Sequence, residues 1–103
     1  MRQRRYILAP EAARDVVQIW RHLKEEAGQD TADRIESVIR NKFAYLAEFP
    51  GNGHKRLDLT AADVRFLAVY SYLIVYRPKT KPLQIVSILH GSRDVAKILG
   101  KRF

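Results

Sequence analysis

The chain has 103 residues, 47% of them hydrophobic, and a single domain with one small core is expected over residues 1–103. It has no cysteine, which excludes disulfides, thiolate metal sites and thiol nucleophiles, and no apolar run is long enough to span a membrane. The net charge is +8, and residues 50–103 supply most of it, with ten basic and three acidic side chains. A cytoplasmic protein is expected, whose second half attracts a polyanion or an acidic protein; the alternative is a merely solubilising basic surface.

The first half of the sequence predicts a short strand followed by two helices. RYILA (5–9) favours a strand, and Pro10 suits the first position of a helix. Apolar residues then recur at helical spacing and predict one buried helix face: Val16, Ile19, Trp20, Leu23 and Ala27. Gly28 favours a stop with a left-handed backbone.

A second helix is expected to begin with a cap at Asp30 or Thr31 and to end at FPGNG (49–53). Its predicted apolar stripe consists of Ile35, Ile39, Leu46 and Phe49, with Val38 and Phe43 beside it. The link between the two helices is only a few residues, which favours an antiparallel helical hairpin.

The second half is rich in β-branched and aromatic residues and predicts three strands, at 64–69, 72–77 and 83–89. Tyr70 and Ser71 would form a tight hairpin turn, 78–82 a second turn, and 94–99 a closing helical turn. The predicted fold class is α+β, in the order β-α-α-β-β-β. The helical hairpin packs on one face of a small, mainly antiparallel sheet, and the other face is expected to be open.

The candidate chemistry centres on HGSRD (90–94), between the last strand and the closing helix. The three histidines and the carboxylates lack the spacing of a metal site, and neither a P-loop nor a serine hydrolase pattern is present, so no cofactor is expected. Metal-free RNA cleavage needs an acid, a base and cations. The residues that could supply them are His90, Arg56, Arg65, Arg77 and Arg93. The plainer alternative makes Arg65 and Arg77 outward-facing strand residues and His90 and Asp94 turn residues.

Aromatic side chains crowd the predicted hairpin, with Tyr70 at its turn and Tyr72 and Tyr76 on one strand face. Aromatic residues interleaved with arginine can stack on bases, but tyrosine is also common at protein interfaces. We favour an interface, with packing under the helices as the third alternative. Trp20 is expected in the core, or half-exposed at a groove that holds a partner segment.

Four strings in this order resemble the ParE branch of the RelE/ParE toxin superfamily, over nearly the whole chain. They are PEAARDVVQIWRHL (10–23), FPGNGHKRL (49–57), YLIVYR (72–77) and ILHGSRD (88–94). The resemblance implies a toxin of a bacterial toxin–antitoxin module, neutralised by a cognate antitoxin with a DNA-binding dimeric part and a tail that wraps the toxin. It implies DNA gyrase as the target of ParE-type toxins, whereas RelE-type relatives cut mRNA on the ribosome. No tyrosine follows HGSRD, and this departure from RelE-type nucleases favours ParE.

Given this resemblance, two residue sets are expected to contact partners. The predicted target-binding residues are Arg77, His90, Arg93 and Lys97. The predicted antitoxin-binding residues are Trp20, Leu23, Arg65, Tyr70, Tyr72 and Tyr76. Within HGSRD, Gly91 is expected to let the chain turn, Asp94 to start the last helix, and Arg93 to face an acidic partner.

Three hypotheses follow from the sequence. The first is a gyrase-poisoning toxin that acts by binding and not as an enzyme. The second is a metal-independent, ribosome-dependent endoribonuclease that uses His90 and the arginines. The third is an attenuated family member that only binds its antitoxin and co-represses its operon. Substitution of His90 separates the first two, because one acid or base is typically worth about 10²–10⁴-fold in rate.

Overall fold

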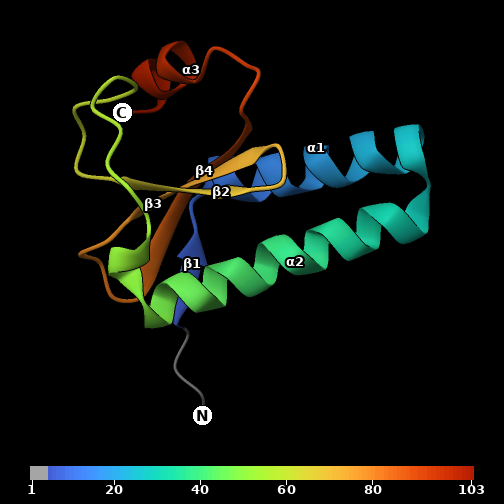
Figure 1. Cartoon of the computed structure of the whole chain (residues 1–103), viewed down its shortest axis with the longest axis horizontal. Helices are drawn as coiled ribbons and strands as arrows, with labels where there is room; N and C mark the ends of the chain where they lie inside the picture. The colour runs from blue at the N-terminus through green and yellow to red at the C-terminus, as the bar shows by residue number, and fades with distance from the viewer. Residues whose placement is uncertain (1–4) are drawn as a thin grey trace.

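A four-stranded sheet forms the centre of the protein in a computed structural model, which describes residues 5–103 (Figure 1). The first four residues of the predicted domain lie outside the described part. The strands are β1 (Tyr6–Leu8), β2 (Arg65–Val69), β3 (Tyr72–Arg77) and β4 (Leu83–His90). Their order in the sheet is β1-β4-β3-β2, with β1 parallel to β4 and the other pairs antiparallel. The predicted α+β class and the order of the elements are confirmed.

Two long helices form the predicted antiparallel hairpin, α1 (Pro10–Ala27) and α2 (Gln29–Glu48). Gly28 alone joins them, with a φ of 91° that glycine adopts without a steric penalty. Because α2 already begins at Gln29, the predicted cap at Asp30 or Thr31 is wrong. Gly28 itself occupies the cap position, and no side chain caps this helix.

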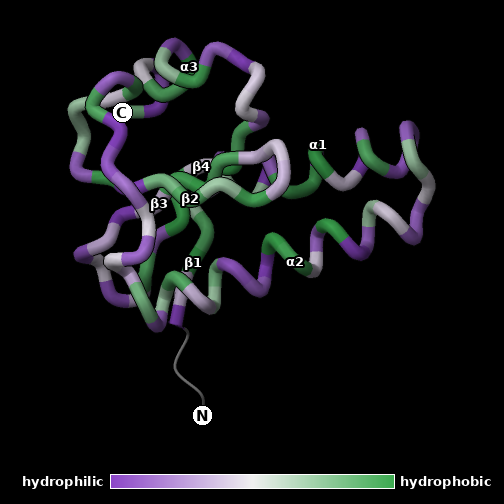
Figure 2. The backbone as a smooth tube through the Cα atoms, in the orientation of Figure 1, coloured by the Kyte–Doolittle hydropathy of each residue, from purple (hydrophilic) through white to green (hydrophobic). Residues whose placement is uncertain are grey.

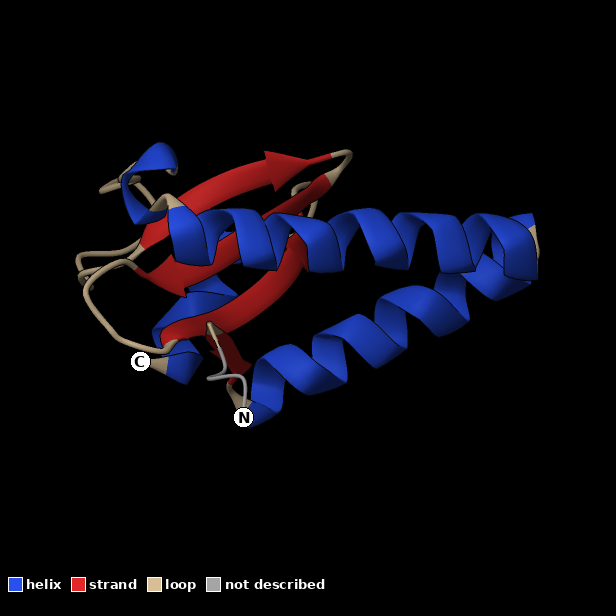
Figure 3. Cartoon of the chain, turned by 90° about the horizontal axis from the view of Figure 1, so that it is seen from below, coloured by secondary structure: helices blue, strands red, loops and turns tan. Residues whose placement is uncertain are grey.

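The hairpin packs on one face of the sheet through its base, and its tip projects beyond the sheet (Figures 1 and 3). Near the base, Ala12 and Val16 of α1 and Phe43 of α2 are buried. Toward the tip, Trp20 and Leu23 are half-buried and Ala27 is exposed, so the predicted face of α1 is buried only over its first half. Phe49, expected in the core, is 48% exposed because the helix has already ended and the chain turns into a short 3₁₀ helix at Pro50–Asn52.

The second face of the sheet is covered, so the prediction of an open face is wrong. Helix α3 (Val95–Arg102) and the segment before β2 pack on it. Seven buried side chains form this second core: Val64, Phe66, Val75, Val86, Leu89, Val95 and Leu99. Most residues of β3 and β4 are buried, and green segments of the tube lie at the centre of the sheet in Figure 2, so these strands need cover on both faces.

The turn between β2 and β3 consists of Tyr70 and Ser71, as predicted. Tyr70 has a φ of 54°, in the left-handed region that is unfavourable for a bulky residue, and its side chain is 63% exposed. No helix within residues 5–103 is long and apolar enough to cross a membrane.

Candidate functional site

HGSRD links β4 to α3 and is tied to the β2–β3 turn. The Gly91 N–H donates to the Ser71 carbonyl oxygen at 2.7 Å. The Asp94 carboxylate accepts from the Lys97 N–H at 3.2 Å and caps α3, so the predicted start of the last helix is confirmed. Gly91 does not have a positive φ, and a Cβ there would meet only the Ser71 carbonyl oxygen, at 3.4 Å. The turn therefore forms without the backbone freedom that was expected of this glycine.

The His90 side chain is held by its neighbours. The Ser92 N–H donates to Nδ1 at 3.1 Å, and the Ser92 hydroxyl lies 2.6 Å from the same nitrogen. Because Nδ1 accepts a hydrogen bond, the neutral imidazole carries its proton on Nε2. The ring also meets Tyr72 edge to face, with 5.3 Å between the ring centroids. His90 therefore presents Nε2–H as its available donor.

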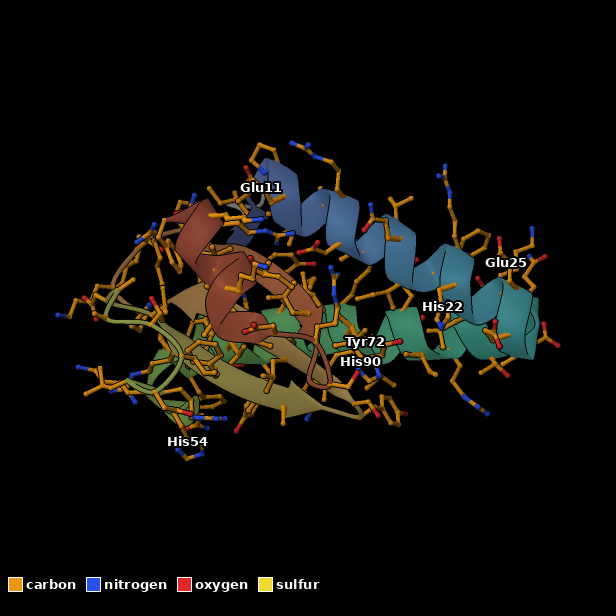
Figure 4. The ribbon with its side chains drawn as sticks, turned by 90° about the horizontal axis from the view of Figure 1, so that it is seen from above. Glu11, His22, Glu25, His54, Tyr72 and His90 are labelled. Atoms are coloured by element: carbon orange, nitrogen blue, oxygen red, sulfur yellow. The ribbon has the colours of Figure 1, made fainter. Side chains whose placement is uncertain are left out.

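An open pocket of about 420 Å³ lies between α1 and this end of the sheet. The turn contributes Ser92 and Arg93 to its wall. Helix α1 and the strands contribute Gln18, Ile19, His22, Tyr72, Ile88 and His90. Figure 4 shows His22, Tyr72 and His90 together at this end of the molecule and His54 away from them. Of the expected target-binding residues, the structure brings His90 and Arg93 together here.

The arginines proposed for RNA cleavage do not converge on His90. Arg77 pairs with Gln84, six residues before His90 along β4, which places it about 20 Å away along the strand. Arg65 lies at the same far end, where it donates to the Gly53 carbonyl oxygen at 3.0 Å. Arg56 forms an exposed ion pair with Asp58 at 2.8 Å. Only Arg93 shares a site with His90.

The expected target-binding set is therefore divided between two ends of the molecule. Arg77 lies beside the last residue of the chain, with its guanidinium 5.4 Å from the Phe103 ring centroid. Lys97 is exposed in the first half of α3. Arg93 is exposed, as predicted, at the rim of the pocket.

The expected antitoxin-binding residues are also dispersed. Tyr76 is fully buried; its hydroxyl donates to the Pro50 carbonyl oxygen at 2.6 Å and accepts from the Gly53 N–H at 2.8 Å. It has no surface to offer an antitoxin, so that prediction is wrong. Tyr72 is only 8% exposed and lines the pocket. Burial raises the pKa of both phenols.

Trp20 and Leu23 keep part of their surface in solvent on the outer half of α1. The Trp20 indole N–H donates to Asp33 of α2 at 2.8 Å, and the Lys24 ammonium lies 5.2 Å from the ring centroid. Trp20 is thus partly exposed and not in the core, and its contact with a partner segment stays a prediction.

One buried polar network was not predicted. Asp15 of α1 is 5% exposed and accepts two hydrogen bonds from Arg102 of α3 and one from the Ile88 N–H. The hydrogen bonds that Arg102 donates to the Asp15 carboxylate raise the pKa of its guanidinium above its usual range. The sequence contains a signal, because Asp15 falls three residues after Ala12 on the buried face of α1.

Within residues 5–103, no group of three or more histidine, aspartate or glutamate side chains is placed to hold a metal ion.

Residues 6–95 match the family model described as the ParE toxin of type II toxin–antitoxin systems, parDE. The chain is 30% identical over 88 residues to toxin ParE3 of Caulobacter vibrioides, an alignment that covers 85% of this chain and 87% of that protein. A solved structure of the chromosomal ParDE toxin–antitoxin system from P. aeruginosa has the same fold, with a TM-score of 0.71 and 23% identity over 82% of this chain and 92% of the other.

These matches define the class of protein as a toxin of a bacterial type II toxin–antitoxin system. Within that class, the chain belongs to the ParE toxin family.

Proposed function

We propose that this ParE-family toxin acts by binding and inhibiting DNA gyrase, and that it does so without chemistry of its own. The observation that carries the proposal is the separation of His90 from Arg65 and Arg77, about 20 Å along the sheet. Cleavage of RNA needs an acid, a base and cations around one phosphate. No such arrangement surrounds His90 in the described part of the chain, whereas exposed Arg93 and Lys97 suit a binding surface.

A cognate antitoxin would neutralise the toxin by binding to it. Residues 50–103 carry a net charge of +7, which attracts an acidic segment. Four residues of the expected set remain available at least in part and are proposed as contacts: Trp20, Leu23, Arg65 and Tyr70. The proposed antitoxin has a dimeric DNA-binding part and a tail that wraps the toxin, and the complex would act in the cytoplasm.

The direct experiment is a supercoiling assay with purified gyrase, relaxed plasmid and the purified toxin. The proposal predicts loss of supercoiling, accumulation of protein-linked broken DNA, and recovery when the antitoxin is added first. Loss of activity in Arg93→Gln and Lys97→Gln, with Arg21→Gln of α1 unchanged, would assign the surface. Unimpaired supercoiling at stoichiometric excess of toxin would contradict the proposal, and cleavage of mRNA in a parallel translation reaction would identify a ribosomal target instead.

A further inference from the structure

The pocket between α1 and HGSRD has a specific balance of charge. Arg93 is exposed at its rim and has no ion-pair partner among residues 5–103. Asp15 also lines the pocket, but its charge is neutralised by Arg102 at 2.6 Å. The fixed charge of the pocket that has no partner is therefore that of Arg93, about +1, which suits a monoanion better than a phosphate dianion.

The pocket also holds donors that match a carboxylate. The Arg93 guanidinium can bind a carboxylate through two parallel N–H bonds. His90 presents Nε2–H, because Nδ1 is occupied by the Ser92 N–H at 3.1 Å. Gln18 and His22 line the same pocket from α1, and Figure 4 shows His22 on that helix. Two elements that are far apart in sequence thus place donors around one space.

Apolar side chains form the rest of the wall. Ile19 of α1, Ile88 of β4 and the Tyr72 ring line the pocket beside the polar groups. The volume of about 420 Å³ lies in the range of small-molecule sites and exceeds what a bare carboxylate needs. A ligand that fills this space must therefore have an apolar body attached to its anionic group.

We infer that this pocket is a binding site for a carboxylate carried on an apolar body. The carboxylate binds between Arg93 and His90, and the apolar body packs on Ile19, Ile88 and Tyr72. Two sources share this chemistry: a free organic acid, or an acidic residue next to an apolar one on a partner polypeptide. The inference does not depend on gyrase being the target.

The test uses the full chain and 3-phenylpropionate as the probe, with 3-phenylpropionamide as the neutral control. The chain has three histidines, and His54 lies away from the pocket, so it serves as an internal reference (Figure 4). In NMR titrations at fixed pH, the imidazole signals of His22 and His90 should shift saturably with the acid while that of His54 stays constant. Equal shifts of all three signals, or equal binding of the amide, would overturn the inference.

Matched variants sharpen the result. Arg93→Gln and His90→Gln should each weaken binding of 3-phenylpropionate by about tenfold or more, as expected for loss of a charge-assisted hydrogen bond. Arg21→Gln, an exposed residue of the same helix as His22, should leave the affinity unchanged. An amide fingerprint spectrum establishes that each variant is folded. Undiminished binding in Arg93→Gln would overturn the assignment.

The two sources are distinguished by competition. If the cognate antitoxin displaces 3-phenylpropionate, and Arg93→Gln weakens the antitoxin complex, the natural ligand is a polypeptide carboxylate. If the complex with antitoxin still binds the probe with the same affinity, the ligand is a free acid. Both results support the pocket, and the supercoiling assay separately decides the proposed function.

Discussion

Arg102 of α3 forms a hydrogen-bonded ion pair with Asp15 of α1, which lies 87 positions earlier in the chain. One guanidinium nitrogen lies 2.6 Å from Oδ2 and the other 3.0 Å from Oδ1. The same carboxylate accepts from the Ile88 N–H at 3.0 Å, beyond the point where β1 ceases to pair with β4. Arg102 also donates to the Ser87 hydroxyl at 2.8 Å. The ion pair therefore joins α1 and α3 beside the part of β4 that has no pairing with β1.

Asp15→Ala should lower the free energy of unfolding by about 3 kcal/mol, because it leaves the Arg102 guanidinium and the Ile88 N–H without their partner. Urea denaturation with two spectroscopic probes measures the effect. The control is Glu36→Ala, which removes an exposed i,i+4 pair with Arg40 and should cost less than about 0.5 kcal/mol. Equal effects of the two substitutions would show that the Asp15–Arg102 pair does not join the elements as described.

Gly53→Ala should destabilise the protein by about 1–3 kcal/mol, because a Cβ there would collide with the Tyr76 ring, 2.7 Å from Cε1. The Tyr76 hydroxyl would also have to leave its hydrogen bonds with Gly53 and Pro50. Gly51→Ala is the matched control, since no atom lies within 4 Å of a Cβ at that position. Thermal unfolding of both variants decides the matter, and an unchanged melting temperature for Gly53→Ala would refute the close contact.

Burial raises the pKa of Tyr72 and of Tyr76, so these two of the five phenols should ionise at higher pH than usual. In the unfolded chain both phenols have a pKa of about 10. The folded state therefore keeps both phenols protonated to a higher pH than the unfolded chain does. This difference stabilises the folded state fully below about pH 10, and the stabilisation is lost as pH rises above that value. Phenolate absorbance should show a delayed fraction that shrinks in Tyr76→Phe. A single titration step for all tyrosines would contradict this prediction.

Tyr70→Gly should maintain or raise stability, by up to about 1 kcal/mol, because glycine removes the steric cost of a φ of 54°. Ser71→Gly, the neighbouring turn residue without a positive φ, should instead lower stability slightly. Chemical denaturation of both variants measures the difference. If exposed Tyr70 contacts the antitoxin as proposed, Tyr70→Gly should also weaken the toxin–antitoxin complex by about tenfold, although the variant itself is at least as stable as the wild type.

Much of the fold was predictable because local patterns and tertiary packing agree in most elements. The strand at Tyr72–Arg77, the stop at Gly28 and the cap at Asp94 all follow from residue type and spacing. The errors arose where tertiary geometry decides burial. Ala27 and Phe49 continue apolar stripes, but Ala27 lies beyond the sheet and Phe49 lies past the end of its helix, and both are exposed.

The candidate site was predicted only in part, because register and helix docking are long-range properties. Arg93 was expected near His90 because the two are close in sequence, and they do share the pocket. Arg77 pairs with Gln84 and therefore lies at the other end of the sheet. His22 and Gln18 reach the pocket only because α1 packs along β4, which no motif in the sequence encodes. The buried Tyr76 was mistaken for surface because its strand has no clear polar face.

The central claim is that the toxin acts by binding gyrase. The most direct test is to measure DNA and protein synthesis in the first minutes after the toxin is expressed without its antitoxin. Precursor incorporation into DNA and into protein would be followed in one culture, for the wild type and for His90→Gln. The account predicts that DNA synthesis falls first, with chromosome breaks and filamentous cells, and that His90→Gln does not cause the loss of about 10²–10⁴-fold expected for a catalytic acid or base. An earlier fall in protein synthesis, abolished by His90→Gln, would contradict it and establish a ribosome-directed nuclease.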